Sequence, residues 1–352
     1  MAAAVVAWLR GRVWRALLCG VALSGGPAAA ATAPRVEVLD VRRIWDRAPH
    51  NAFPDLVHWR ARWWCSLREG DAHVGGADGA ARVLSSADGR VWEPAARITE
   101  TDTDLRDPRL SVMPDGRLMM VCGGSVYLGT KQLKGRRPRV LFSTDGARWT
   151  VPRPILSEGE WLWRVTWHDG VAYGTAFAES PAGPTGERAL VLYRCRDGET
   201  WEKVVQLAVP GRPSEATLRF DDAGRMVAVV RREGGDRMGW LGRAAPPYTA
   251  WEWHPGNRRF GGPNLLAMPD GSWLLGTRDY APTQPGVKPG EAMVLATLNA
   301  AGATAPVVTL PSGGDCSYPG LAWHEGVLWV AYYSSHEGKA AIYLARVRLN
   351  EP

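Results

Sequence analysis

The chain has 352 residues, of which 45% are hydrophobic and 22% charged, and its formal net charge is +6. This composition excludes an intrinsically disordered or collagen-like protein, while the length fits two average domains or one large all-β domain. Tryptophan is abundant, with 18 copies against 5 phenylalanines, which favours a repeated β structure in which each copy buries one ring.

The first element in chain order is an N-terminal targeting segment. Arginines at positions 10, 12 and 15 precede the apolar run 16–23, and the small residues 27–31 follow. This order is typical of a bacterial secretory signal, so we expect residues 1–31 to be removed and the mature protein to be secreted or periplasmic. A membrane anchor is the alternative, but the apolar run is shorter than the ~20 residues that a stable span needs.

Charge and cysteine content exclude further classes. Removing residues 1–31 takes away three of the 42 Lys and Arg residues and none of the 36 acids, so the mature net charge is 39 − 36 = +3. A nucleic-acid partner is therefore not expected. The remaining cysteines form no CxxC pair, and no histidines cluster in the sequence, so we predict no zinc site and leave one disulfide open. They are Cys65, Cys122, Cys195 and Cys316.

A strand, a tight turn and a second strand recur six times along the chain. β-forming runs flank each turn, as in a β-hairpin. The turns lie at Arg60-Ala61, Asp115-Gly116, Asp169-Gly170, Ala223-Gly224, Asp270-Gly271 and Glu325-Gly326.

A third strand and a loop of the form Ser/Cys-x-Asp-Gly-x-x-Trp follow three of these hairpins. The loops end at Trp92, Trp149 and Trp201, which are 57 and 52 residues apart. Four strands in about 50 residues, repeated six times, predict one domain over residues 35–352, an all-β six-bladed β-propeller. A two-sheet sandwich would not explain the period. In the loop, Asp can accept backbone N–H groups, Gly permits positive φ and Trp packs between sheets, so its role is structural.

Propeller geometry selects the candidate site. The start of the first strand and the end of the second lie at one edge of a hairpin, so in six blades these positions meet around the axis. We expect Asp107, Arg109, Arg164 and Asn264 to bind substrate there. The positions selected by aligning the turns are Asp55, Asp107, Arg109, Arg164, Glu215, Asn264, Tyr318, Arg68, Arg231 and Arg278.

Arg68, Arg231 and Arg278 occupy equivalent strand ends and would form a receptor for a carboxylate. The alternative is that each pairs with a neighbouring acid, such as Asp279 or Glu69, in which case the acidic-ligand interpretation loses its basis. Convergence of the three side chains on one point therefore tests the interpretation.

One pair of residues and one further acid could carry out nucleophilic and acid–base chemistry. Tyr318 beside Glu215 would be a nucleophile with its base, and Asp71, in the loop after a second strand, or Asp107 would protonate a leaving group. The alternatives are that Tyr318 belongs to the core and that Asp71 is a solvated loop residue.

The sequence of about residues 45–350 resembles the exo-α-sialidase (neuraminidase) superfamily. The resemblance is to a divergent, bacterial sialidase-like branch. The three Asp-Gly loops resemble its Asp box, shortened by one residue. The Glu215–Arg231 spacing, Gly70-Asp71-Ala72 and Tyr318 are similar to its site segments. The resemblance implies retaining hydrolysis of a terminal sialic acid or related acidic sugar. Tyr318 would be the nucleophile, Glu215 its base and Asp71 the acid/base, with arginines on the substrate carboxylate and no metal or cofactor.

The sequence also departs from the family's pattern. Ala52-Phe53-Pro54 replaces an Arg-Ile-Pro run, Tyr332-Tyr333-Ser334 lies where a glutamate is usual, and Pro319 follows the tyrosine. These changes indicate a remodelled pocket in which Arg68 could substitute for the lost arginine. Two further functions stay open: a propeller hydrolase of another glycan, and a non-catalytic glycan-binding propeller. In each case we expect a glycan partner and a monomer.

Overall fold

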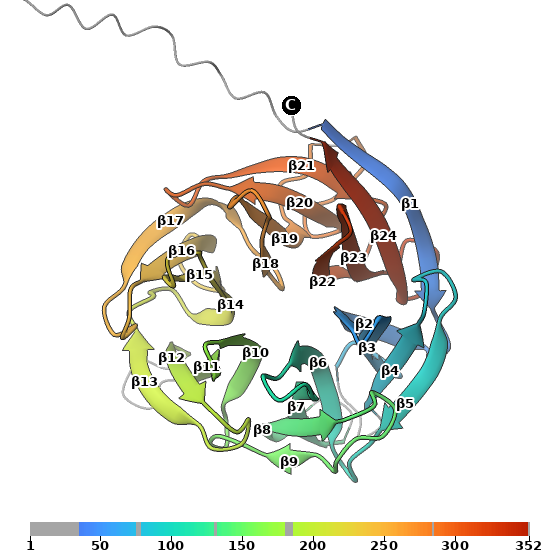
Figure 1. Ribbon diagram of the computed structural model, residues 1–352, viewed down its shortest axis with the longest axis horizontal. Helices are drawn as coiled ribbons and strands as arrows, with labels where there is room; N and C mark the ends of the chain where they lie inside the picture. The colour runs from blue at the N-terminus through green and yellow to red at the C-terminus, as the bar shows by residue number, and fades with distance from the viewer. Residues whose placement is uncertain (1–34, 75–78, 130–131, 180–185, 284, 351–352) are drawn as a thin grey trace, which may run out of the picture. The chain divides into compact units, whose positions relative to one another are not determined.

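The computed structural model describes residues 35–74, 79–129, 132–179, 186–283 and 285–350. The described strands all belong to one compact unit, Pro34–Glu351. The expected signal segment 1–31 lies outside the described residues. Within the described ranges all regular structure is β, in six four-stranded sheets arranged as a ring (Figure 1). The six-bladed β-propeller is confirmed.

Five blades are built from consecutive antiparallel strands, the first strand innermost. The first blade comprises β2 (His50–Trp59), β3 (Arg62–Gly70), β4 (Ala80–Ser86) and β5 (Glu93–Ile98). The second comprises β6 (Asp104–Val112), β7 (Leu118–Leu128), β8 (Gln132–Ser143) and β9 (Arg153–Pro154). The third comprises β10 (Trp161–His168), β11 (Val171–Glu179), β12 (Arg188–Cys195) and β13 (Glu202–Leu207).

The later blades follow the same plan. The fourth comprises β14 (Pro213–Phe220), β15 (Met226–Arg232), β16 (Met238–Ala244) and β17 (Glu252–Arg259). The fifth comprises β18 (Asn264–Ala267), β19 (Trp273–Asp279), β20 (Ala292–Leu298) and β21 (Thr304–Leu310). The sixth comprises β22 (Cys316–His324), β23 (Val327–Ser334), β24 (Ala341–Asn350) and β1 (Arg35–Trp45).

The two ends of the strand-forming chain close the ring together. β1 pairs antiparallel with β24, from Arg35 opposite Asn350 to Trp45 opposite Ile342, so the N-terminal strand is the outermost strand of the last blade (Figure 1). This pairing covers the outer edge of β24 and ties the first described residues to the last.

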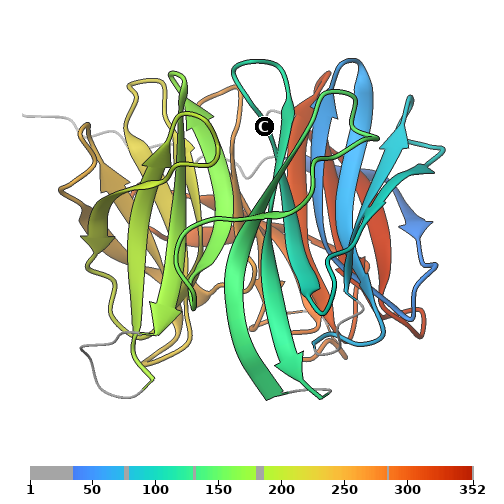
Figure 2. The ribbon, with the colours of Figure 1, turned by 90° about the horizontal axis from the view of Figure 1, so that it is seen from below.

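The expected hairpin turns join the first and second strands of every blade. At Arg60-Ala61 and Asp169-Gly170 both central residues have positive φ, from 48° to 74°, as a type I′ turn requires. Seen from the side, the strands run between the two faces of the ring, so these turns gather at one end of each blade (Figure 2).

The Asp-Gly loops stabilise the packing between neighbouring blades. In the loop of the second blade, Asp145 accepts the backbone N–H groups of Ala147 and Arg148 at 3.0 and 2.7 Å. Gly146 has φ +77°, and a Cβ there would lie 2.3 Å from the indole of Trp64 in the first blade. The corresponding glycines of the other two loops also lie close to an aromatic ring of the preceding blade. Gly89 lies against Trp329 of the sixth blade, and Gly198 lies against Phe142 of the second blade.

The four cysteines of the described chain are buried and free, so the disulfide that the sequence left open is not formed. Among the described residues, no helix has the length and apolar character needed to cross a bilayer.

Candidate functional site

A β-bulge recurs in the innermost strand of five blades, next to the propeller axis. At each bulge, two residues on the inner strand oppose one on its partner, which bends the strand and redirects side chains. The bulges lie between Ala52 and Asp55, Arg106 and Arg109, Leu162 and Val165, Pro213 and Ala216, and Ser317 and Gly320.

Three bulges hold a non-glycine residue at positive φ: Phe53 (58°), Asp107 (50°) and Tyr318 (55°). Such a conformation costs about 1–3 kcal/mol and clusters at functional sites. Gly262 occupies the corresponding place in the fifth blade, and a Cβ there would lie 2.5 Å from Cγ of Tyr318. The tyrosine ring therefore depends on this glycine for space, and the bulges bring Phe53, Asp107 and Tyr318 to one cavity.

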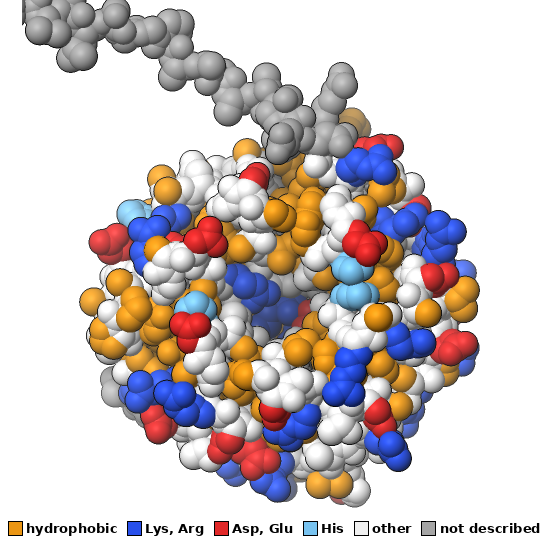
Figure 3. All heavy atoms as spheres, viewed as in Figure 1, with side chains coloured by type: hydrophobic (Ala, Val, Ile, Leu, Met, Phe, Trp, Pro, Cys, Tyr) orange, Lys and Arg blue, Asp and Glu red, His pale blue; other side chains and the backbone are white. Residues whose placement is uncertain are grey.

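The cavity has a volume of about 450 Å³, within the range of small-molecule sites. It carries an excess of positive charge, because five arginines and three carboxyl side chains line it. On the face seen in Figure 3, the centre of the ring is hollowed and Lys and Arg side chains gather there. The charged lining residues are Arg106, Arg136, Arg188, Arg212, Arg231, Asp107, Glu215 and Glu233.

Tyr318, Glu215 and Arg231 form one hydrogen-bonded group on the cavity wall. The phenol donates to Oε1 of Glu215 at 3.0 Å and accepts from Nη1 of Arg231 at 2.7 Å. The guanidinium also donates to Oε1 of Glu215 at 3.0 Å. Phe53 and Trp163 pack edge-on against the tyrosine ring, at centroid distances of 5.2 and 5.6 Å. The phenol is thus fixed and aimed at the carboxylate.

The protonation states of the pair suit proton transfer from phenol to carboxylate. Burial raises the pKa of Tyr318, and Glu215 adds to this rise, so the phenol is neutral. Burial alone would raise the pKa of Glu215 as well, but the charge of Arg231 and hydrogen bonds from Ser214 and Tyr318 outweigh it. The net pKa of Glu215 lies below its usual value, which keeps the carboxylate ionised beside the phenol.

Asp107 is a second carboxyl group in the cavity, and its environment is opposite to that of Glu215. Burial raises its pKa, and Arg109 and Arg106 offset this only in part. Its Oδ1 has no hydrogen-bond partner among the described residues, and the nearest guanidinium nitrogen, Nη2 of Arg109, lies 3.7 Å away. The carboxyl group is therefore predisposed to hold a proton that a bound molecule could receive.

The three arginines at equivalent strand ends do not form the expected cluster. Arg68 is fully buried, donating from Nε to Asp104 at 2.6 Å and from Nη1 to the carbonyl of Ala72 at 2.7 Å. Arg278 pairs with Asp315 at 3.2 Å and passes over the ring of Tyr318. Of the three, Arg231 lines the cavity. The expectation of convergence is wrong, because each guanidinium pairs with a carboxylate on a different element, so this trio no longer supports the acidic-ligand interpretation.

Arg109, Arg164 and Asn264 belong to a different, smaller cavity of about 100 Å³. Arg164 pairs with the buried Asp55 at 2.7 Å, and Asn264 donates to the carbonyl of Pro319 at 3.0 Å. Their contacts tie inner strands of different blades together. The substrate contacts expected of them remain predictions.

Asp71 lies in the loop after β3 with an exposed side chain, and it is not among the residues that line the cavity. The acid/base role that the resemblance implies for it remains a prediction.

Sequence reasoning missed several cavity residues that lie just outside the aligned positions. Arg106 directly precedes Asp107, Arg212 directly precedes β14, and Glu233 directly follows β15. Arg136 and Arg188 are on third strands, which the alignment of hairpins did not include. Extending that alignment to the start of each third strand would have found the last two.

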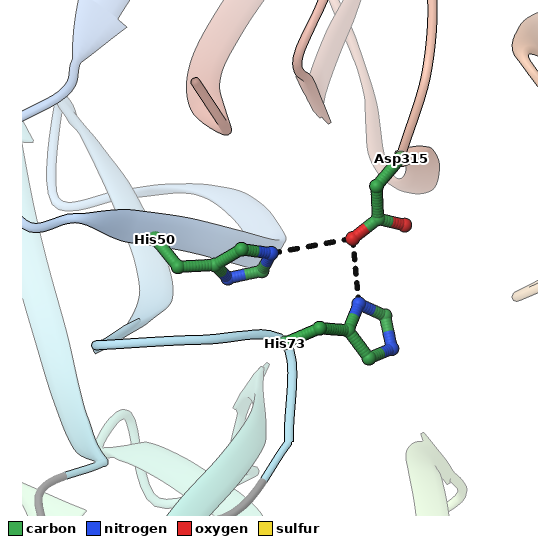
Figure 4. A group of neighbouring side chains, drawn as sticks. All are labelled: His50, His73 and Asp315. Atoms are coloured by element: carbon green, nitrogen blue, oxygen red, sulfur yellow. Dashed lines mark hydrogen bonds and ion pairs between the residues drawn. The ribbon is translucent and has the colours of Figure 1, made fainter.

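A group of possible metal ligands was missed as well. His50, His73 and Asp315 come from three distant segments, and one ligand atom of each lies within 4.8 Å of the others (Figure 4). The sequence separates them by 23 and 242 residues, so no spacing motif could reveal them.

No protein-family model matches the sequence, and no curated protein matches it either. Solved structures do match. A protein of unknown function from Dyadobacter fermentans aligns with a TM-score of 0.75 and 18% identity over 90% of this chain and 99% of its own. The α-L-arabinofuranosidase of Fusarium graminearum, solved with arabinobiose, aligns with a TM-score of 0.66 and 15% identity. The alignment covers 88% of this chain and 98% of the arabinofuranosidase chain.

The sialidase of Trypanosoma rangeli, solved with sialic acid, gives a TM-score of 0.67 and 11% identity over 89% of this chain. The match spans 59% of the sialidase chain, so the present chain corresponds to little more than half of it. At these identities the likeness concerns the fold. The chain has the six-bladed propeller fold that sialidases share with the arabinofuranosidase.

Proposed function

We propose that the protein is a retaining glycoside hydrolase that removes a terminal acidic sugar, such as a sialic acid, from glycans. The observation that carries this proposal is the buried phenol of Tyr318, hydrogen-bonded to the ionised Glu215 in a cavity with excess positive charge. The similar folds of a sialidase and an arabinofuranosidase support a glycosidase. The resemblance noted in the sequence supports the tyrosine nucleophile.

In the first step, the phenol oxygen of Tyr318 attacks the anomeric carbon while Glu215 takes the phenol proton. The bond to the leaving oxygen breaks, and that oxygen receives a proton from Asp107. We assign the acid to Asp107 rather than Asp71 because Asp107 lines the cavity and burial favours its protonated form. A neutral phenol suits an acidic sugar, since it approaches the substrate carboxylate with less repulsion than an anionic nucleophile would.

In the second step, the Asp107 carboxylate takes a proton from water, which attacks the anomeric carbon. The bond between that carbon and the tyrosine oxygen breaks, and Glu215 returns its proton to the phenolate. Arg231, which donates to the phenol oxygen at 2.7 Å, stabilises negative charge as it develops on that atom. Each turnover consumes one water and restores every side chain.

The preference for an acidic substrate rests on the five arginines of the cavity. Arg231 is engaged by Glu215 and Glu233, whereas Arg106 stacks over Phe53 at 5.4 Å and has a buried Nε without a hydrogen-bond partner among the described residues. Arg136 donates a hydrogen bond from Nε to the carbonyl of Gly159. Arg106 and Arg136 are therefore our candidates for the substrate carboxylate, in place of Arg68 and Arg278.

A hydrolase of another glycan is the second candidate. Ala52 stands where the sialidase pattern has arginine, and the ring of the next residue, Phe53, lies 5.2 Å from that of Tyr318. This apolar wall would suit a sugar without a carboxylate at that side of the nucleophile. We also propose that residues 1–31 direct export of the protein and that the mature protein is a monomer.

The test compares fluorogenic 4-methylumbelliferyl substrates: an α-sialoside, a β-glucuronide and a neutral α-L-arabinofuranoside. The proposal predicts turnover of an acidic substrate, lost in Tyr318→Phe and in Glu215→Gln. Preferred turnover of the neutral furanoside would favour the second candidate. A folded protein that hydrolyses none of them, but binds on a glycan array, would be a binding propeller and would refute the enzyme.

A further inference from the structure

His50, His73 and Asp315 converge from two blades near the ring closure (Figure 4). His50 begins β2, His73 lies in the loop after β3, and Asp315 directly precedes β22. Both imidazoles point at the same carboxylate oxygen: Nε2 of His50 lies 3.2 Å and Nδ1 of His73 2.6 Å from Oδ2 of Asp315. None of the three belongs to the set that lines the Tyr318 cavity.

These distances suit a small divalent ion at the centre of the group. In a tetrahedral zinc site with metal–ligand bonds near 2.1 Å, neighbouring ligand atoms lie about 3.4 Å apart. The contact between Asp315 and His50, at 3.2 Å, is close to this length, and the contact of 2.6 Å between Asp315 and His73 has to lengthen by less than about 1 Å. His73 is in a loop with a side chain that is 43% exposed, so it is free to make that adjustment.

The carboxylate is held by a second set of partners, as is usual for a metal ligand. Oδ1 of Asp315 accepts the hydroxyl of Tyr333 at 2.7 Å and pairs with Nη2 of Arg278 at 3.2 Å. These contacts leave Oδ2 directed at the two imidazoles. Because Tyr333 is fully buried, its hydroxyl fixes the carboxylate in one orientation.

The group is reached from solvent on one side and approaches the Tyr318 cavity on the other. The side chains of His73 and Asp315 are 43% and 31% exposed, whereas that of His50 is 13% exposed. The ring of His73 packs edge-on against Phe53 at 5.1 Å, and Phe53 lines the cavity. A three-ligand ion here would keep an open position for water or another oxygen donor, as three-ligand zinc sites do.

We propose that His50, His73 and Asp315 bind one divalent transition-metal ion, Zn²⁺ by their ligand chemistry, and that the ion clamps the first blade to the sixth beside the cavity mouth. Two neutral imidazoles and a carboxylate suit zinc better than calcium or magnesium, which prefer all-oxygen sites. The proposal is independent of the hydrolase function.

The test uses tag-free mature protein, stripped with chelator and titrated with Co²⁺, whose visible spectrum reports ligand number. We expect one Co²⁺ per chain with the strong absorption of a four-coordinate site, displaced by one equivalent of Zn²⁺. The midpoint temperature of thermal unfolding should rise when Zn²⁺ is added. His73→Ala and Asp315→Asn should weaken binding by more than the 10–100-fold typical of losing an outer-sphere partner, and Tyr333→Phe by an amount within that range.

His254→Ala is the matched control, because His254 lies in β17 of the fourth blade, outside the group. Its affinity for Co²⁺ should equal that of the unchanged protein. Absence of Co²⁺ binding by folded protein would overturn the proposal. Binding that survives both His73→Ala and Asp315→Asn would overturn it equally, since the ion would then occupy another site. Neither outcome depends on glycosidase activity.

Discussion

Asp107→Asn separates the two candidates for the proton donor. The substitution preserves the shape of the side chain and removes the acidic proton. The fold should tolerate it, since Oδ1 has no hydrogen-bond partner among the described residues and the nearest guanidinium nitrogen lies at 3.7 Å. The protonated carboxyl group and the amide are both neutral and similar in size, so we expect the free energy of unfolding to change by no more than about 1 kcal/mol.

The effect on catalysis should be much larger and should depend on the leaving group. General acid catalysis contributes about 10²–10⁴-fold, or about 3–5 kcal/mol of barrier. A natural glycoside with an alkyl leaving group needs this proton, whereas an acidic phenol leaves as its anion. Asp107→Asn should therefore lose about 10²–10⁴-fold in kcat/KM on an alkyl glycoside and far less on the 4-methylumbelliferyl substrate.

The pH dependence gives an independent measure. Burial raises the pKa of Asp107, and the protonated form is the active one, so kcat/KM of the unchanged enzyme should fall as pH rises through that pKa. The pH profile of Asp107→Asn should lack this fall at high pH. Asp71→Asn, measured in parallel, should keep it. If Asp107→Asn retains activity on the alkyl glycoside to within tenfold while Asp71→Asn loses it, the acid is Asp71 and our assignment is refuted.

Three further predictions concern the nucleophile and the blade loops. Tyr318→Phe should lose at least about 10³-fold in kcat/KM yet unfold normally, because the carboxylate and guanidinium beside its hydroxyl remain paired; retained activity would exclude the phenol. Gly146→Ala should lower the free energy of unfolding by about 2–4 kcal/mol in denaturant titrations, since the new methyl group would clash with Trp64 and the backbone has positive φ. Gly116→Ala has a similar φ but open space around it, so it should lose only the stability that the positive φ costs. Equal losses in the two variants would refute the packing argument. Asp145 has a pKa lowered by backbone hydrogen bonds from Arg148 and its turn, so its contribution to stability is present above its unfolded pKa and disappears as pH falls; Asp145→Asn should show a weaker acid dependence, and an unchanged one would contradict the role of the loop.

Local patterns predicted the fold because each blade repeats the same local physics. The turns Arg60-Ala61 and Asp169-Gly170 need positive φ, and the strands around them alternate as β-hairpins do. The pairing of Glu215 with Tyr318 could also be anticipated, since both start innermost strands and the axis brings such positions together. Periodicity therefore carries information about which residues meet at the axis.

The direction of individual side chains could not be predicted in the same way. The bulges turn Asp107 and Arg106 into the cavity, and a bulge has no signature in a single sequence. Arg68 and Arg278 occupy equivalent strand ends but turn to Asp104 and Asp315, because local carboxylates compete for each guanidinium. Spacing along the chain places a residue near the axis, and only tertiary contacts decide what it faces.

The central claim is that Tyr318 forms a covalent bond to the sugar, and trapping that bond tests it most directly. A fluorinated analogue of the best acidic substrate with an activated leaving group should accumulate the glycosyl-enzyme, which intact mass and peptide mapping can locate. The account predicts one sugar per chain, on the peptide containing Tyr318, and no label in Tyr318→Phe. A label on Glu215 or Asp107, or rapid turnover without any adduct, would contradict it.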